Sequence, residues 1–155
     1  KLGHARLCEV NRTDFDRDVP ALREEFGDRA VLRCIHYWYE NDLVDRRWEA
    51  LQSANIDAFL SLTRASGASS AMYLQNVVAE LGREQPAMYA LGLAEHILNG
   101  RGAVRIHGGG FGGTIQAFVP LDLVDGFIER MDYWLGSGSS RRYKVSDEGA
   151  FAAWL

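Results

Sequence analysis

A glycine-rich stretch is the part of this chain whose residue types and spacing are best suited to chemistry. Five glycines fall within the six positions 108–113, interrupted by Phe111. Glycine adopts positive φ without steric cost but weakens regular elements, so this density predicts a loop that turns sharply or approaches another group closely. Successive N–H groups in such a loop can form a concave site for an anion. The candidate site residues are Gly108, Gly109, Gly110, Phe111, Gly112 and Gly113.

Two basic side chains come just before this loop. Arg105 and His107 alternate along an expected strand, so both point to the face opposite Val104 and Ile106. Either side chain could face an anion, although a surface or core position is commoner for a lone arginine or histidine. Both are candidates for residues close to a site, and neither is assigned a catalytic role.

The loop does not fit the two common nucleotide motifs. Gly108, Gly110 and Gly113 have the spacing of the dinucleotide fingerprint, but that fingerprint requires a helix after the loop. Residues 114–119 are instead β-branched and aromatic, which predicts a strand. The phosphate-loop motif requires a lysine after its last glycine, and Thr114 stands there. A glycine loop between two strands remains, either a loose hairpin connection or a backbone surface that packs against a ligand.

Composition sets the broad class. The 155 residues suggest one domain, and 47% apolar with 25% charged residues is ordinary for a globular protein. A net charge of −4 argues against nucleic-acid binding, and no apolar run reaches the ~20 residues of a membrane span. With no leader sequence, we expect a cytoplasmic location. Cys8 and Cys34 have no metal or redox spacing, so we expect reduced thiols. A disulfide between them stays open, because the sequence does not give the distance between the two side chains.

The longest helix is expected over residues 30–51. Apolar side chains recur there at helical spacing and form a one-sided face. They are Val31, Ile35, Tyr39 and Leu43, continued by Val44, Trp48 and Leu51. His36 lies among them, and we expect it to be a packed, hydrogen-bonded core residue rather than a ligand. A shorter helix is expected before it, with Pro20 in its first turn and Gly27 at its end.

The remaining pattern places helices before strands. A helix from about residue 56 should stop near Gly67, because the hydroxyl-rich residues 66–70 resemble a helix-capping break. Further helices are expected over 72–81 and 87–98, strands over 103–107 and 114–119, a helix over 124–135 and a third strand over 142–145. This order predicts an α+β fold, with an antiparallel sheet covered by helices on one side.

Three segments together resemble a known family. Gly-Gly-Gly-Phe-Gly-Gly-Thr at 108–114 resembles the third signature motif of the GHMP small-molecule kinases, in the galactokinase branch. Residues 27–33 with Glu40-Asn41 are similar to a helical segment of bacterial galactokinases. Residues 66–70 with Leu-Gln-Asn at 74–76 are similar to the segment that follows it. The resemblance extends from about Glu9 to Gly149.

The resemblance implies a ferredoxin-like C-terminal domain. Residues 1–155 would form a single domain, the C-terminal half of a two-domain sugar kinase whose N-terminal ATP- and sugar-binding domain is absent. The full-length enzyme would use ATP and Mg to phosphorylate the anomeric hydroxyl of galactose or a related small sugar. The first two family motifs, with the catalytic aspartate and its arginine partner, are not found here. We therefore expect the chain alone to be inactive, with no bound cofactor.

Several alternatives stay open. By resemblance, Ser69 and Ser70 approach the active-site side of the domain, whereas their composition indicates helix capping. No histidine or aspartate stands at a spacing that marks these serines as nucleophiles. His107 replaces the more usual small or hydroxylic residue before the glycines, which leaves the sugar open. The parent protein could also be a non-catalytic sugar-sensing module, or a kinase for another small alcohol such as mevalonate or homoserine.

Overall fold

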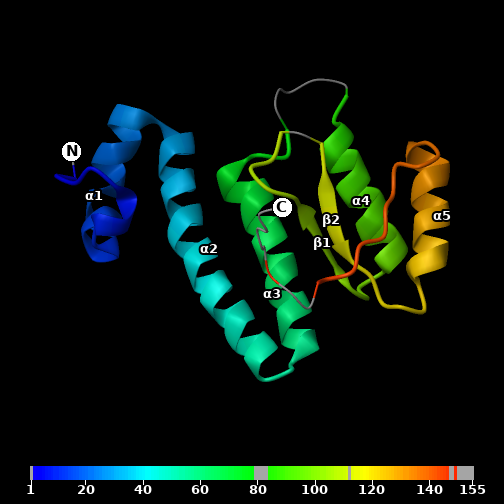
Figure 1. The fold of residues 1–155 in the computed structure, drawn as a ribbon. Coiled ribbons are helices and arrows are strands. Elements are labelled where there is room, and N and C mark those ends of the chain that lie inside the picture. The colour runs from blue at the N-terminus through cyan, green and yellow to red at the C-terminus, as the bar shows by residue number, and fades with distance from the viewer. Residues whose placement is uncertain (1, 79–83, 112, 147–148, 150–155) are drawn as a thin grey trace, which may run out of the picture.

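The computed structural model describes residues 2–78, 84–111, 113–146 and 149. Helices come first in this part of the chain, and a small two-stranded sheet and one further helix follow (Figure 1). The elements are the 3-10 turn η1 (Leu7–Glu9), α1 (Arg12–Phe26), α2 (Asp28–Gln52), α3 (Ile56–Ser69), the π-helical turn η2 (Ser70–Leu74), α4 (Pro86–Leu98), β1 (Ala103–Ile106), β2 (Ile115–Phe118) and α5 (Val124–Leu135). None of the described helices is long and apolar enough to cross a membrane.

Helix α1 begins earlier than its proline indicates. The side chain of Asn11 accepts a hydrogen bond from the Thr13 N–H at 2.8 Å and so caps the helix. Pro20 lies inside the helix instead of in its first turn, so the predicted start was wrong. The predicted end is confirmed, since Gly27 terminates α1 at a φ of 83°.

Helix α2 confirms the predicted long helix, but only part of its predicted apolar face is buried. Val31 and Leu43 are buried, whereas Val44, Trp48 and Leu51 are exposed, with Trp48 at 63%. The prediction was wrong for these three residues because they lie in the second half of α2, which α1 does not cover. Helix α1 covers the first half of α2, where the rings of Phe15 and Trp38 lie 4.7 Å apart.

Helix α3 does not stop at the hydroxyl-rich segment. It runs to Ser69 and continues into η2, so the predicted break was wrong. Small residues let this part of α3 approach β1 closely. A Cβ on Gly67 would lie 3.0 Å from the Val104 carbonyl oxygen and 3.2 Å from the Arg105 Cβ. The serines of this segment are buried by that approach.

The helix predicted over 72–81 is also wrong within the described residues. The turn η2 ends at Leu74, its C-cap Gln75 has a left-handed φ of 57°, and residues 76–78 are not helical. Positions 79–83 lie outside the described residues. Helix α4 then begins at Pro86, which occupies its first turn, and ends at Leu98 with Asn99 as its C-cap, as the spacing of its apolar residues predicts.

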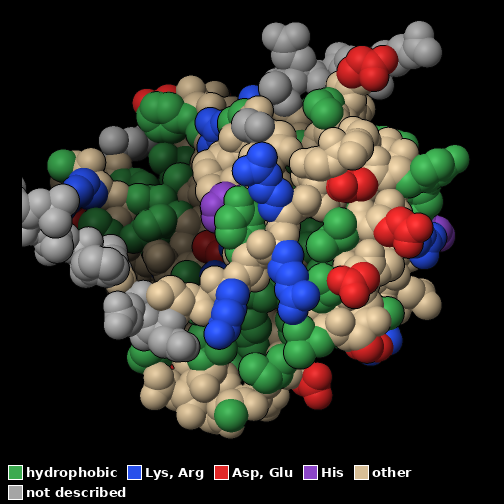
Figure 2. All heavy atoms as spheres, turned by 45° about the vertical axis from the view of Figure 1, so that its right-hand side comes forward, with side chains coloured by type: hydrophobic (Ala, Val, Ile, Leu, Met, Phe, Trp, Pro, Cys, Tyr) green, Lys and Arg blue, Asp and Glu red, His purple; other side chains and the backbone are tan. Residues whose placement is uncertain are grey.

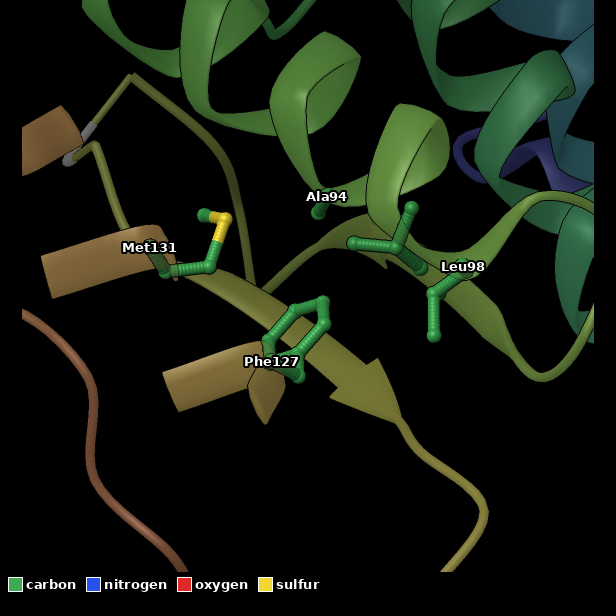
Figure 3. Packing of buried hydrophobic residues seen from close by; sticks show 5 residues of the cluster. Ala94, Leu98, Phe127 and Met131 are labelled. Atoms are coloured by element: carbon green, nitrogen blue, oxygen red, sulfur yellow. The ribbon is translucent and has the colours of Figure 1, made fainter. Parts of the chain in front are cut away.

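The sheet confirms the predicted α+β class. Strands β1 and β2 pair antiparallel, with Val104 opposite Ala117 and Ile106 opposite Ile115. Val104 belongs to the main core, together with residues from α4 and α5, four of which are labelled in Figure 3. That core consists of Ala94, Leu98, Val104, Phe127 and Met131. Helix α3 lies along β1, away from this core (Figure 1).

The third strand predicted over 142–145 does not form. These residues pair with no strand among the described parts of the chain. With residues 139–141, they line a groove of about 710 Å³ between β2 and α5. β-propensity alone does not make a strand, and within the described residues the sheet contains only β1 and β2. Basic side chains gather near the middle of the face seen in Figure 2, and Arg141, Arg142 and Lys144 are exposed.

Candidate functional site

The glycine loop joins β1 to β2 and turns as the sequence predicts. Among its described residues, four have positive φ: Gly108 at 64°, Gly110 at 81°, Phe111 at 58° and Gly113 at 76°. At its base, the His107 N–H donates to the Thr114 carbonyl oxygen at 2.9 Å, which extends the antiparallel pairing. A strand, and not a helix, follows the loop, so the structure excludes the dinucleotide arrangement.

One side of this loop is docked on Asn76. The Phe111 N–H donates to the Asn76 carbonyl oxygen at 2.9 Å. A Cβ at Gly110 would lie 2.3 Å from that oxygen and 2.6 Å from both Cβ and Nδ2 of Asn76. Real side chains do not approach so closely, so only glycine fits this position without a shift of its neighbours. Asn76 itself is 1% exposed.

The other side of the loop is open. A Cβ at Gly108, Gly109 or Gly113 would meet no atom of another residue within 4 Å. The ring of Phe111 is 50% exposed. Gly112 lies outside the described residues. Away from its contact with Asn76, the described part of the loop therefore exposes mainly backbone, together with Phe111.

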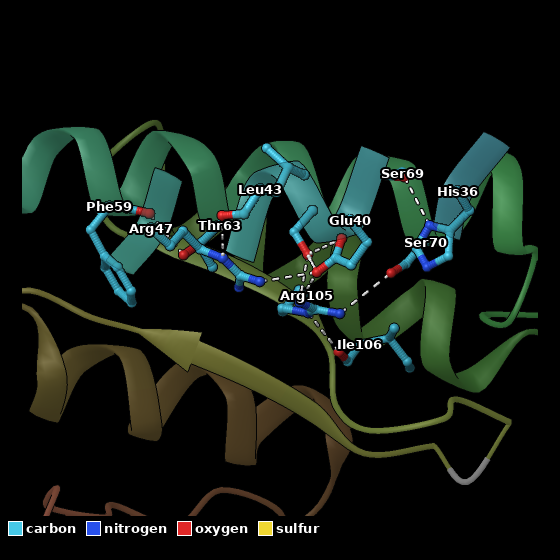
Figure 4. A network of polar contacts seen from close by, with 11 residues as sticks. His36, Glu40, Leu43, Arg47, Phe59, Thr63, Ser69, Ser70, Arg105 and Ile106 are labelled. Carbon is cyan, nitrogen blue, oxygen red and sulfur yellow. Dashed lines mark hydrogen bonds and ion pairs between the residues drawn. The ribbon is translucent and has the colours of Figure 1, made fainter. Parts of the chain in front are cut away.

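Arg105 belongs to a network of polar side chains between β1, α2 and α3 (Figure 4). Its Nη1 lies 3.2 Å from Glu40 Oε1 and also donates to Ser66 Oγ. The Ser66 hydroxyl donates in turn to Glu40, at 2.6 and 2.8 Å from its two oxygens. Arg47 Nη2 donates to Glu40 Oε1 at 3.0 Å. The two arginines and the glutamate are only 17–20% exposed, so they bind α2 and α3 to the strand with little solvent screening.

The two candidate serines, Ser69 and Ser70, lie beside this network in the protein interior. Ser70 Oγ lies 3.5 Å from Arg105 Nη2, a long contact. Ser69 Oγ lies 2.9 Å from His36 Nδ1, and both serines are buried. Burial lowers the pKa of His36, with Arg105 acting in the same direction and Glu40 opposing it. His36 is therefore hydrogen-bonded as the sequence predicts, but it is only partly buried and does not belong to the core.

The structure separates the two basic candidates. Arg105 points into the network, on the face opposite Val104 as expected, whereas His107 is exposed at the base of the loop. A substrate-proximal role of Arg105, His107, Ser69 and Ser70 stays a prediction. The sequence reasoning missed Asn76 as the support of the loop. The sequence feature that could have pointed to Asn76 was the resemblance of Leu-Gln-Asn at 74–76 to the family segment. No spacing rule connects Asn76 to glycines so distant in the chain.

A metal or nucleotide is not assigned to these residues. Among the described residues, no group of three histidine, cysteine, aspartate or glutamate side chains is arranged to hold a metal ion. The acidic Glu40 is already engaged by two arginines and a serine. The described residues therefore offer no site for the magnesium that the resemblance implies for the full-length enzyme. Cys8 is exposed, Cys34 is half-buried, and the two thiols are unpaired.

Comparison with known proteins relates this geometry to one class of enzyme. The chain is similar to the crystal structure of Lactococcus lactis galactokinase complexed with galactose, with a TM-score of 0.62 and 27% sequence identity. The match covers 87% of this chain and 33% of that one, so the chain spans about one third of the length of that galactokinase. No protein-family profile matches the sequence. The chain has a galactokinase-like α+β fold.

Proposed function

We propose that this chain is the C-terminal domain of a galactokinase-type sugar kinase. The observation that carries the proposal is the glycine loop, fixed on one side by Asn76 and open on the other. The likeness to Lactococcus lactis galactokinase over most of the chain supports the class, and the galactose in that structure supports a sugar substrate. In this proposal, residues 1–155 form one domain, and an ATP- and sugar-binding domain precedes them in the parent protein.

The loop would form one wall of the substrate pocket. Phosphoryl transfer depends chiefly on positioning and on groups that neutralise developing charge. A wall without side chains lets a sugar or phosphate come close to backbone N–H groups, which are fixed dipoles. The groups that hold ATP and Mg and that act on the sugar hydroxyl would belong to the preceding domain. The chain alone is therefore expected to be inactive and to bind no cofactor.

Comparing the product of the complete reading frame with residues 1–155 tests this proposal. The assay measures galactose-dependent ADP release in the presence of MgATP. We expect turnover by the complete protein and none by residues 1–155 alone. Turnover by residues 1–155 would contradict the assignment of the catalytic groups to the preceding domain. A complete protein that binds galactose without turnover would be a sugar sensor, and one that phosphorylates mevalonate or homoserine in preference would have another substrate.

A substitution on the open side of the loop tests the wall itself. Gly109 has room for a side chain and no positive φ, so Gly109→Val leaves the fold intact but projects methyl groups from the wall. In the complete protein, we expect at least a tenfold loss of kcat/KM for galactose, about 1.4 kcal/mol or more of transition-state binding. Gly126→Ala in α5, which also meets no neighbour, is the matched control and should retain full activity.

A further inference from the structure

The groove between β2, α5 and the chain after α5 has a volume of about 710 Å³ and an apolar side. All the residues that α5 contributes to it are apolar, and they include Phe127, Ile128 and Met131. Phe127 and Met131 also belong to the main core. Protein cores leave few voids larger than a water molecule, so an apolar space of this size beside the core is suited to a further piece of polypeptide.

One edge of β2 faces this groove. The His107 N–H donates to the Thr114 carbonyl oxygen at 2.9 Å, which identifies these two residues as a hydrogen-bonded pair. Such pairs alternate along an antiparallel ladder, so the N–H and C=O groups of Ile115 and Ala117 point away from β1. Both residues line the groove. A strand lying there could therefore pair with β2 on the edge that β1 does not use.

The opposite wall of the groove, residues 139–145, has the sequence pattern of a strand. Tyr143 and Val145 alternate with Arg142 and Lys144, and all four side chains are exposed. Within the described residues these positions do not pair with the sheet, which contains only β1 and β2. A strand between β2 and residues 142–145 would give both of them a neighbour.

The two walls define the chemistry of such a strand. Its side chains would point alternately to the two faces of the sheet. One set would lie on the apolar residues of α5 and should be apolar. The other set would lie near the exposed Arg141, Arg142 and Lys144 and should include acidic residues.

The parent protein is the source that the comparison favours. This chain spans 33% of the length of Lactococcus lactis galactokinase, so a protein of that length has much further chain to supply a strand. A strand from the same polypeptide also binds at a high effective concentration.

We infer that an extended segment of the parent protein, located before residue 1, adds a strand to β2 in the groove between β2 and residues 142–145. The inference rests on the proposed function, which places a domain before residue 1. Helices α1 and α5 lie at opposite ends of the molecule (Figure 1), so this strand lies well upstream of residue 1. Its backbone hydrogen bonds join the two parts of the parent protein through a shared sheet.

Photo-cross-linking in the product of the complete reading frame tests the occupant. Tyr143→benzoylphenylalanine places a reactive group at the groove, on a side chain that is 83% exposed. Tyr133→benzoylphenylalanine, on α5 and outside the groove lining, is the matched control at 84% exposure. Mass spectrometry of the digested protein should find a link from position 143 to a peptide before residue 1. The control should give at least tenfold less of that link.

Three results would overturn the inference: a link from position 143 to residues 150–155, a covalent dimer on a denaturing gel, or no link to any peptide before residue 1. Amide hydrogen exchange of the unsubstituted complete protein gives an independent measurement. The amides of Ile115 and Ala117 should exchange within tenfold of the rate of Gln116, whose N–H points to β1. Exchange at least a hundredfold faster at Ile115 and Ala117 would also overturn the inference.

Neither measurement uses a sugar or ATP, so the inference and the proposed function can fail separately. Galactose-dependent turnover without the upstream link would overturn the inference and leave the kinase assignment. The upstream link without turnover would support the shared sheet and contradict the kinase assignment.

Discussion

At the scale of single residues, the contact between Gly110 and Asn76 decides where the glycine loop lies. Gly110 combines a φ of 81° with a contact that excludes any Cβ. Gly109, its neighbour, has neither restriction. Two adjacent glycines therefore have different physical reasons to be glycine. Gly110 is required by the docking of the loop, whereas Gly109 contributes an open backbone surface.

Gly110→Ala should destabilise the protein by about 1–3 kcal/mol, because alanine is strained at positive φ and its Cβ would collide with Asn76. The loss of stability is limited because the loop can detach from Asn76. Gly109→Ala is the matched control and should change stability by no more than about 0.5 kcal/mol. Urea unfolding of both variants measures the difference. Equal stability of the two variants would show that the loop is not docked as described.

His36 gives the protein a pH dependence whose sign follows from its environment. Burial lowers the pKa of the folded histidine below its ordinary value of 6.5, so the unfolded chain takes up a proton first as the pH falls. The contribution of His36 to stability is thus present above pH 6.5 and is lost as the pH falls through and below that value. His36→Asn keeps a polar side chain near Ser69 and does not titrate.

We expect the free energy of unfolding to fall less between pH 7 and 5 in His36→Asn than in the unsubstituted protein. Denaturant unfolding at several pH values measures this difference. His96→Asn, on the distant helix α4, is the control substitution for the loss of a histidine. A parallel pH dependence of the His36→Asn and unsubstituted proteins would contradict the lowered pKa.

At the scale of elements, the approach of α3 to β1 organises the centre of the molecule. Gly67 lies in van der Waals contact with the strand, and Ser66 joins Glu40 to Arg105 across the same contact. A larger side chain at position 67 would separate the helix from the strand. The hydroxyl-rich composition that resembles a helix end in the sequence therefore serves a close helix–strand contact.

Gly67→Val should destabilise the protein by about 1–3 kcal/mol, because its added atoms overpack the contact with Val104 and Arg105. Gly92→Ala, in α4, meets no neighbour and should stabilise by about 0.5–1 kcal/mol through helix propensity alone. Chemical denaturation of the two variants tests these opposite signs. A stabilised Gly67→Val variant would show that α3 and β1 are not in close contact.

At the scale of the whole molecule, the apolar core is divided. One cluster joins α1 to α2 through Phe15, Leu22 and Val31. The main cluster joins α4, α5 and the sheet, and it includes Leu98. In Figure 1, α1 lies beside α2 and away from the sheet. Helix α1 can therefore detach at a lower free energy than the rest of the fold.

Phe15→Ala and Leu98→Ala should destabilise different parts of the molecule. Leu98→Ala should cost about 2–5 kcal/mol of global stability, because it opens a cavity in the main core. Phe15→Ala should increase hydrogen exchange mainly in residues 12–26, with a global loss limited to the free energy that holds α1. Hydrogen exchange resolved along the chain distinguishes these results. Uniformly faster exchange in Phe15→Ala would show that the molecule unfolds as one unit.

Local patterns predicted the regular elements well. The helices over 28–52, 86–98 and 124–135 follow from apolar residues at helical spacing, and the two strands follow from β-branched residues around the glycines. The segments that failed are those whose structure depends on a distant neighbour. Ser66 to Ser70 became helical against β1, and residues 142–145 did not pair with the sheet.

The sequence by itself determined the α+β class, the antiparallel pair and the glycine loop, because periodicity and glycine content act over a few neighbouring residues. Only the tertiary structure decided that Asn76 supports the loop and that Arg105 is held by Glu40 and Ser66. These contacts join residues far apart in the chain. Their geometry depends on the approach of α3 to β1, which no local pattern specifies.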